Sequence, residues 1–264
     1  EGDGAGTPYK IGTAEELYWF AGLVNGTLPG VKKDLSANAI LTDDIIVNTG
    51  VLDPNKDLVS GNDFIEWIPI GKSSSDDDAY TGTFDGNGHP ISGLYFNKSN
   101  SWYVGLFGCI GAEGKISNVG VSDSYFQSSN CPYIGGVCGS NSGELQNCSN
   151  SSTVIGKENE YRIGGVCGYN YGGTIKSCYN TASVSGQYSV GGVCGDNYEG
   201  PITNCYYLSG TVADGKGGIG GKDDENGKAV EMSKDRFKSG EVAWLLNGSK
   251  SVSTEESTLA WYQK

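Results

Sequence analysis

The sequence predicts an all-β protein, a right-handed parallel β-helix solenoid with coils of about 28 residues and short helical caps at both ends. A run of hydrophobe, Gly, Gly, Val, Cys and Gly recurs along the chain, and similar β-prone segments follow each copy. Glycine makes up 43 of 264 residues, about 16% against a usual ~7%. A unit of this length cannot bury its own apolar face, so the copies must stack. No 3.6-residue period links the copies, which argues against a helical solenoid.

Residues 1–80 are predicted to form an N-terminal capping helix and the entry strands. Thr13 and Glu16 have the spacing of a capping box, and Gly26 is a typical helix stop. Apolar side chains follow the helical spacing i, i+3, i+4 and i+7 at Leu17, Phe20, Ala21 and Val24. We expect this helix to cover the first coil, because an open solenoid end exposes core and unpaired strand edges.

Residues 81–222 form the predicted β-helix repeat region. The run stands at 134–139, 163–168 and 190–195, and a diverged copy that is one glycine shorter stands at 104–108. The repeated polar and thiol positions are Cys138, Cys167 and Cys194; Asn141, Asn170 and Asn197; and Cys148, Cys178 and Cys205. We expect three-sided coils in which like residues stack about 4.8 Å apart, with the Asn side chains bonded in a ladder.

The repeated cysteines are predicted to be structural. A zinc site requires Cys pairs two to four residues apart or His partners, and the sequence offers neither. Two arrangements remain open, one disulfide within each coil or two columns of stacked, buried thiols, and we favour the thiols. Cys109 and Cys131 stand outside the pattern.

Strand alternation creates a conflict at the second Cys of each copy. Lys176 belongs on the outer face, and strict alternation then places Cys178 outside as well. A bend in the main chain between these two residues would resolve the conflict.

Residues 223–264 are predicted to form a C-terminal helical cap and tail. We expect two short helices at 232–237 and 241–246, the second ending at Asn247 and Gly248. They would cover the last coil as the first helix covers the entry.

These motifs resemble the GLUG-motif family of bacterial surface proteins, whose repeats read hydrophobe, Gly-Gly, hydrophobe, a small or apolar residue and Gly, followed by an Ile-x-Asn segment. All four copies carry the resemblance, and 219–221 resembles a truncated last copy. The resemblance implies a first strand at 41–45 and a turn at 82–89 before the coils, and the closing Trp261 also fits the family. It implies an architecture found in adhesin-like and other exported proteins, and no particular reaction. The Cys in each repeat departs from the commoner apolar or aromatic residue.

Charge and hydropathy restrict the partners. The formal net charge is −13 and the pI is near 4.4, which argues against nucleic acid and anionic membranes because both bind through Lys and Arg. No apolar run approaches the ~20 residues that span a bilayer, so no membrane insertion is expected. The chain starts at Glu1 without Met, and we interpret it as a trimmed segment of a larger exported polypeptide at the cell surface.

The sequence offers no convincing catalytic constellation, and we predict that the chain is not an enzyme. A glycosidase needs paired carboxylates, yet Asp196 and Glu199 share one repeat turn without forming a repeated column. His89 is the lone histidine and is interpreted as a turn residue. No metal or other cofactor is predicted, and the acidic runs at 76–78 and 223–225 would hold Ca²⁺ only weakly.

The tyrosines form the candidate binding surface. Three pairs occupy equivalent positions in successive copies: Tyr161 and Tyr188, Tyr171 and Tyr198, and Tyr179 and Tyr206. Outward-facing ladders would receive sugar rings or a partner protein, whereas the alternative is that the stacked rings only stabilise neighbouring coils. The leading hypothesis is an extracellular adhesion or display module that binds a glycan or a host surface protein. A polysaccharide-active lyase or glycoside hydrolase and a purely structural spacer are the alternatives.

Overall fold

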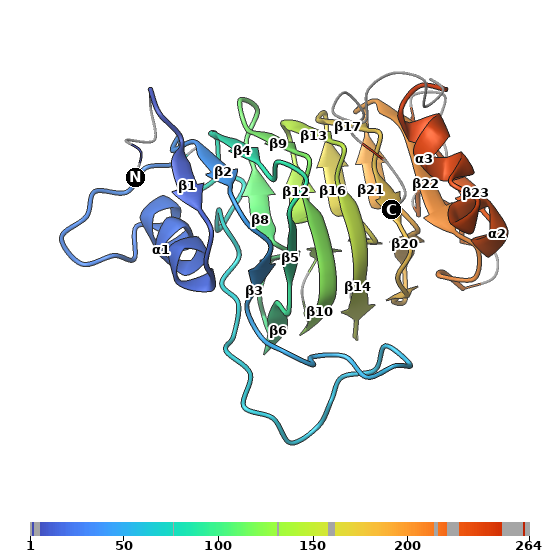
Figure 1. Ribbon diagram of the computed structural model, residues 1–264, viewed down its shortest axis with the longest axis horizontal. Helices are drawn as coiled ribbons and strands as arrows, with labels where there is room; N and C mark the ends of the chain where they lie inside the picture. The colour runs from blue at the N-terminus through green and yellow to red at the C-terminus, as the bar shows by residue number, and fades with distance from the viewer. Residues whose placement is uncertain are drawn as a thin grey trace.

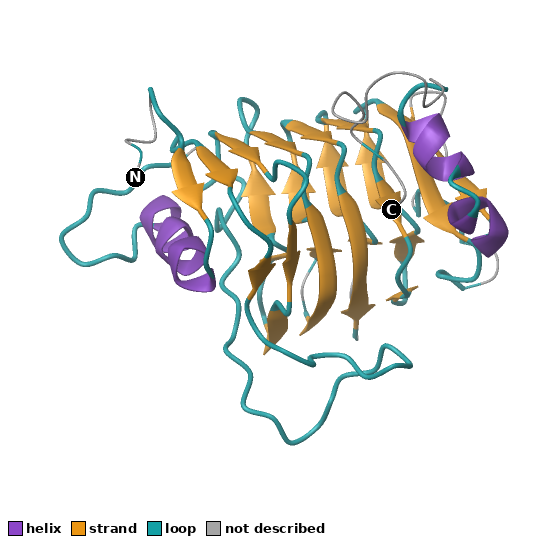
Figure 2. Cartoon of the chain, in the orientation of Figure 1, coloured by secondary structure: helices purple, strands orange, loops and turns teal. Residues whose placement is uncertain are grey.

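The chain forms an elongated parallel β-solenoid with one helix at its N-terminal end and two short helices at its C-terminal end (Figure 1). This computed structural model describes residues 2, 6–75, 77–130, 132–157, 162–213, 216–220, 227–249 and 261. The strands lie across the long axis of the molecule and the coils stack along it (Figure 2). The predicted all-β, parallel β-helix architecture is therefore confirmed.

One coil illustrates how the chain turns. It consists of β11 (Tyr133–Gly135), β12 (Cys138–Asn141), β13 (Glu144–Gln146) and β14 (Ser149–Gly156). The coil has four strands where the sequence indicated three β-prone segments, because the glycine run itself is divided. Gly136 and Val137 form a corner between β11 and β12.

The strands belong to three parallel sheets. One small sheet contains β7 (Tyr103–Val104), β11, β15 (Arg162–Gly164) and β20 (Ser189–Gly191), and the other contains β8 (Phe107–Ile110), β12, β16 (Cys167–Tyr171) and β21 (Cys194–Tyr198). The large sheet contains β13 and β14 together with β1 (Tyr9–Ile11), β2 (Ala39–Leu41), β3 (Ile45–Ile46), β4 (Thr83–Asp85), β5 (Pro90–Ser92), β6 (Tyr95–Ser99), β9 (Lys115–Ser117), β10 (Gly120–Ser129), β17 (Thr174–Lys176), β18 (Tyr179–Asn180), β19 (Val184–Ser185), β22 (Ile202–Leu208) and β23 (Gly227–Met232).

A left-handed residue places the second Cys of each copy inside the coil. Ser177 has φ 52, and the chain bends there between the exposed Lys176 and the fully buried Cys178. The equivalent residues Asn118, Asn147 and Asn204 have φ 55, 54 and 53. The alternation conflict is thus resolved by one left-handed residue per coil, a conformation that Asn tolerates better than most side chains.

The glycines of the repeated run allow main chains to approach closely. A Cβ on Gly164 would overlap the carbonyl oxygen of Cys167 in the same coil, and one on Gly168 would lie 2.6 Å from the carbonyl oxygen of Gly139 in the coil before. None of the run's glycines has a positive φ. Absence of a side chain, and not backbone freedom, is therefore what the run requires.

Buried asparagine ladders join successive coils. Asn141 donates to the Oδ1 of Asn170, and Asn170 donates to the Oδ1 of Asn197, both at 2.8 Å. Asn150 and Asn180 form a second such link at 3.0 Å, which the sequence reasoning missed. Because Asn141, Asn150, Asn170 and Asn180 are fully buried, these bonds satisfy amides that would otherwise be costly to bury.

The N-terminal helix α1 (Ala14–Asn25) covers the entry coils as predicted. The Thr13 side chain accepts the Glu16 N–H at 3.2 Å, and Gly26 ends the helix with φ 64. Phe20 is fully buried and packs on Phe84 at 6.0 Å between ring centroids. Apolar burial against the first coils thus fixes the helix in place.

The first strand expected at 41–45 is instead divided into β2 and β3. Between them Asp43 accepts the Asp44 N–H with its own side chain at 2.8 Å. This local bond takes the place of a ladder bond at that point.

The C-terminal helices α2 (Lys234–Lys238) and α3 (Glu241–Leu246) cover the other end. Met232 was expected to start the first of them but ends β23, which pairs with β22. Val242 and Leu246 of α3 pack with Met232 and Tyr206 in a separate apolar cluster. The last coil is therefore closed by a strand and a helix pair together.

The long segment between β3 and β4 first loops away from the coils and then returns to the core, where Trp67, Ile70 and Tyr80 are fully buried (Figure 1). Its residues Val51 and Leu52 pack on Tyr125, and the Thr153 hydroxyl donates to the carbonyl of Lys56 at 2.8 Å. The segment therefore ties the entry region to coils that follow about 100 residues later in the chain, since Lys56 and Thr153 are 97 positions apart.

Candidate functional site

Stacked tyrosines line the corner between the two small sheets. Tyr103 and Tyr133 are register partners on β7 and β11, and their rings stack with centroids 5.1 Å apart at 12°. Tyr133 also stacks on Tyr169 of β16, at 5.4 Å and 16°. The corner brings these residues together from different sheets, and Tyr103 and Tyr133 were not among the predicted binding tyrosines.

The Arg162 guanidinium packs against two of these rings. Its guanidinium carbon lies 4.4 Å from the Tyr169 ring centroid and 5.4 Å from that of Tyr133. Its Nε donates to the Asp196 carboxylate at 2.7 Å. Burial works to lower the pKa of Arg162, but the hydrogen bond and charge of Asp196 outweigh it and raise the pKa. The cation is thus shared between a carboxylate and two aromatic faces.

A groove of about 740 Å³ opens beside the tyrosines. The groove exists because the side chains at one repeated position differ in size from coil to coil. Cys109, Ser140 and Tyr169 occupy this position as register partners on β8, β12 and β16. The two small residues are buried at the bottom of the groove, and the tyrosine rises as a wall. This volume lies within the 300–1,000 Å³ that is typical of sites for small ligands.

Tyr171 forms the second part of that wall. It is 55% exposed and stacks on Tyr198 of the next coil at 5.4 Å and 15°. The position before it in the column is Ser142, which also lines the groove. The Tyr171 ring also contacts the Tyr169 ring, with centroids 5.8 Å apart at 39°, so it lies between two aromatic neighbours and remains half exposed.

The remaining predicted tyrosines lie elsewhere. Tyr188 is 46% exposed and does not line the groove, and Tyr161 lies outside the described residues. Tyr206 is 7% exposed, and Tyr179 packs on Phe237 and Trp261. The C-terminal cap covers this last pair, so they do not form an open binding ladder.

The repeated cysteines occupy two buried columns. Cys138, Cys167 and Cys194 are register partners across three coils, and the Cys148 N–H points at the Cys178 sulfur at 3.4 Å. All seven described cysteines are free thiols and buried. Burial raises the pKa of Cys109 to about 12 and also raises that of Cys138 and Cys167, which keeps these thiols neutral.

The carboxylates considered from the sequence do not converge. Asp196 is engaged by Arg162, while Glu199 is exposed in a turn with φ 57. In the described part of the groove lining, Glu113 is the one carboxylate and no histidine is present. The acidic runs at 76–78 and 223–225 are wholly or partly outside the described residues.

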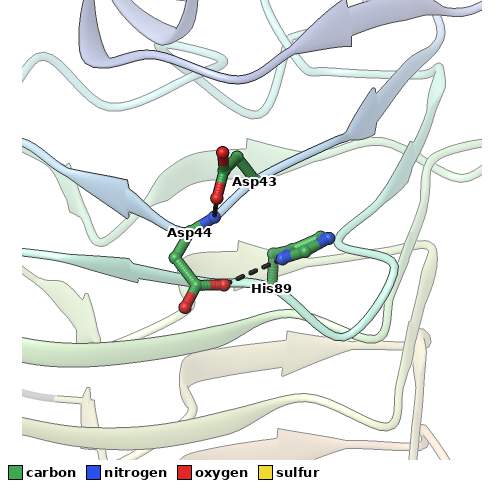
Figure 3. Close-up of side chains that lie close together, drawn as sticks. All are labelled: Asp43, Asp44 and His89. Atoms are coloured by element: carbon green, nitrogen blue, oxygen red, sulfur yellow. Dashed lines mark hydrogen bonds and ion pairs between the residues drawn. The ribbon is translucent and has the colours of Figure 1, made fainter.

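Asp43, Asp44 and His89 form a cluster at the entry to the coils (Figure 3). The three offer one metal-ligating atom each within 4.8 Å of one another, and His89 Nδ1 lies 2.8 Å from an Asp44 oxygen. Both aspartates are exposed. The His–Asp contact fastens the turn before β5 to the start of β3, which agrees with a turn role for His89.

Comparisons with known proteins support the scaffold assignment. A model of the GLUG motif matches residues 159–185, which confirms the predicted resemblance. The chain is 33% identical over 78 residues to a protein of Evansella cellulosilytica named as a Gly-rich membrane protein. It is 40% identical over 84 residues to the halomucin of Haloquadratum walsbyi. These stretches cover 29% and 32% of this chain but 9% and 1% of those proteins, so the chain spans a small part of either relative.

A crystal structure of a Bacteroides ovatus protein, named as an immunoglobulin A1 protease, has a similar fold. The TM-score is 0.52 at 18% identity, over 95% of this chain and 90% of that chain. At this identity the likeness shows the fold alone. None of the helices in the described part of this chain is long and apolar enough to cross a membrane.

Proposed function

We propose that this GLUG-motif chain is a non-catalytic module of an exported surface protein and that it binds a glycan in the tyrosine-lined groove. The observation that carries the proposal is the step from Ser142 to Tyr171, which leaves an exposed aromatic ring at the end of a 740 Å³ groove. Aromatic rings pack on the apolar faces of sugars, and hydroxyl groups around them bond the sugar oxygens.

The surface role is supported by the relatives and by the charge. One relative is named a membrane protein and the other halomucin, and each resembles about 80 residues of this chain. A formal net charge of −13 keeps a chain soluble and discourages contact with anionic surfaces.

A binding role is favoured over hydrolysis by the groove's side chains. Hydrolysis of a glycoside requires two carboxyl groups roughly 5–10 Å apart across the scissile bond. The described lining residues supply Glu113 alone, and Asp196 is paired with Arg162 outside the lining. The arrangement can therefore hold a sugar without the acid–base pair that would cleave it.

Substitution of Tyr171 by Ala tests this proposal. We expect Tyr171→Ala to weaken glycan binding on the order of tenfold, because it removes an exposed aromatic ring at the groove end. The matched control is Tyr188→Ala, which removes an equally exposed tyrosine outside the groove and is expected to leave affinity unchanged. Binding is measured by glycan array and then by isothermal titration calorimetry.

The alternatives have distinct outcomes. Release of reducing ends from any bound polysaccharide would contradict the non-catalytic role. Failure of every arrayed glycan to bind would overturn the binding role and leave a structural spacer as the explanation.

A further inference from the structure

We infer that the ligand of the groove is a short, neutral oligosaccharide of about two to three sugar units, and this inference rests on the proposed glycan-binding function. Three properties of the groove carry it: its length along the solenoid, the charge of its lining, and the chemistry of the groups along it.

The length follows from the coil register. The groove extends from the level of Ala79 and Thr81 to that of Tyr169, passing Cys109 and Ser140. Tyr80 bridges to Ile110, Ile110 pairs with Asn141, and Asn141 pairs with Asn170, which makes three steps between neighbouring coils. At about 4.8 Å for each step the groove is about 14 Å long.

The tyrosines bound one end of the groove. Tyr169 and Tyr171 stand there, and Ser74 also lines the groove, with its hydroxyl 2.9 Å from the Tyr103 hydroxyl. A groove of this length holds a terminal or short segment of a glycan. A longer chain would extend beyond the lining.

The charge of the lining excludes an acidic sugar. Among the described residues, Glu113 is the one charged side chain that lines the groove, and it is exposed. Arg162, the nearest candidate cation in the described tyrosine cluster, is already bonded to Asp196 at 2.7 Å and lies outside the lining. A uronate, sialate or sulfate would face a carboxylate without a compensating cation, in a chain whose net charge is already −13.

The groups along the groove match a neutral oligosaccharide. The Tyr171 ring offers an apolar surface at one end, and the hydroxyls of Ser142, Tyr103 and Thr81, which line the rest of the groove, offer donors and acceptors. The Tyr103 hydroxyl is protonated at neutral pH and can donate, and burial raises its pKa further. Glu113 adds an acceptor for sugar hydroxyls.

Calorimetry at 0.15 M NaCl tests this assignment with defined probes. The neutral probes are cello-, xylo-, manno- and galacto-oligosaccharides of one to six units. The acidic probes are oligogalacturonides, hyaluronan oligosaccharides and sialyllactose. We expect the affinity for a neutral series to rise to three units and then to level off, and acidic probes to bind on the order of tenfold more weakly or not at all.

A charge reversal sharpens the test. Glu113→Lys is expected to raise the affinity for acidic probes several-fold, because it places a cation in the lining. Glu231→Lys makes the same change in net charge on β23, at an exposed position outside the lining, and is expected to have no such effect.

The outcomes separate this inference from the function on which it rests. Two results would overturn the inference: acidic probes that bind more tightly than neutral ones, or an affinity that keeps rising up to six units. If Tyr171→Ala abolishes that binding, the proposed glycan-binding function still stands. If no sugar binds in a manner that depends on Tyr171, both fail.

Discussion

Each glycine of the repeated run stands against atoms of a neighbouring strand or coil. The first, Gly164, abuts the carbonyl of Cys167, and the second, Gly165, abuts the Asn180 side chain and the carbonyl of Gly192. The third, Gly168, abuts the coil before. The run is thus a contact motif that joins one coil to itself and to both neighbours.

Substitution of one of these glycines is expected to disrupt the solenoid. Gly164→Ala should lower the free energy of unfolding by about 3 kcal/mol or more, because the new methyl group meets main-chain atoms that cannot move aside. The measurement is urea unfolding followed by circular dichroism. Gly120→Ala is the control: its nearest neighbour is the Ser149 hydroxyl at 3.0 Å, which can rotate, and we expect a change below about 1 kcal/mol. Equal losses for the two variants would contradict the contact role.

Single residues also explain why the sequence predicts the register of the coils but not the direction of every side chain. The copies align Cys138 with Cys167 and Asn141 with Asn170, and the structure keeps both registers. The alternation rule fails at Ser177 because one left-handed residue reverses the side-chain direction. Asn at the same position in three other coils was the available signal, since Asn favours that conformation.

Helix α3 closes the solenoid through one face only. Val242 is 2% exposed and packs on Tyr206, whereas Trp244 of the same helix is 42% exposed. The cap therefore depends on apolar contacts that the repeat sequence itself does not encode.

A charge on the inner face of α3 should release the cap. Val242→Asp is expected to lower the free energy of unfolding by about 3 kcal/mol, because it buries a carboxylate among apolar side chains. Trp244→Asp adds the same charge on the outer face and should cost less than about 1 kcal/mol. Urea unfolding monitored by circular dichroism gives both values. A stable Val242→Asp protein would show that the cap contributes little.

The capping elements also limit what repeat periodicity can reveal about the site. Tyr179 and Tyr206 repeat as regularly as Tyr171 and Tyr198, yet the C-terminal cap covers the first pair and leaves the second exposed. Periodicity predicts register, and exposure depends on segments far away in sequence.

The groove could not be predicted from the repeats either. It arises where equivalent positions differ, as at Ser140 and Tyr169, and a search for repeated residues overlooks such steps. The stacking of Tyr133 on Tyr169 crosses from one sheet to another at the corner, so the two share no repeat position. The 30-residue spacing of Tyr103 and Tyr133 was a usable signal.

The buried thiols and phenols of the molecule are neutral at physiological pH, and this predicts how its stability depends on pH. Burial raises the pKa of Cys109 and, together with the charge of Glu66, that of Tyr18, each to about 12, and burial also raises those of Cys178 and Cys194. An unfolded Cys titrates near 8.5, so the unfolded chain releases protons first as pH rises. The stability that these groups contribute is fully present below about pH 8 and is lost as pH rises toward 12.

Thermal unfolding across pH checks this prediction. We expect Tm to stay level from about pH 6 to 8 and to fall progressively above about pH 9. Cys109→Ala should show a smaller fall over the alkaline range than the unsubstituted protein, because one of the titrating buried groups is absent. A Tm that is constant up to pH 11 would contradict a core stabilised by neutral thiols and phenols.

Every coil in the repeat region pairs with its neighbours in the same register, so the gene can change by the duplication of whole coils. A duplicated coil finds the same strand partners and the same glycine contacts on both of its sides, so unequal recombination can lengthen the solenoid without altering either end. A coil inserted after Tyr198 would leave the groove intact, since its walls come from residues before that point. A coil inserted between Ser142 and Tyr171 would instead move the aromatic wall and lengthen the groove by one step of about 4.8 Å. The length of the solenoid and the length of the groove can therefore evolve separately.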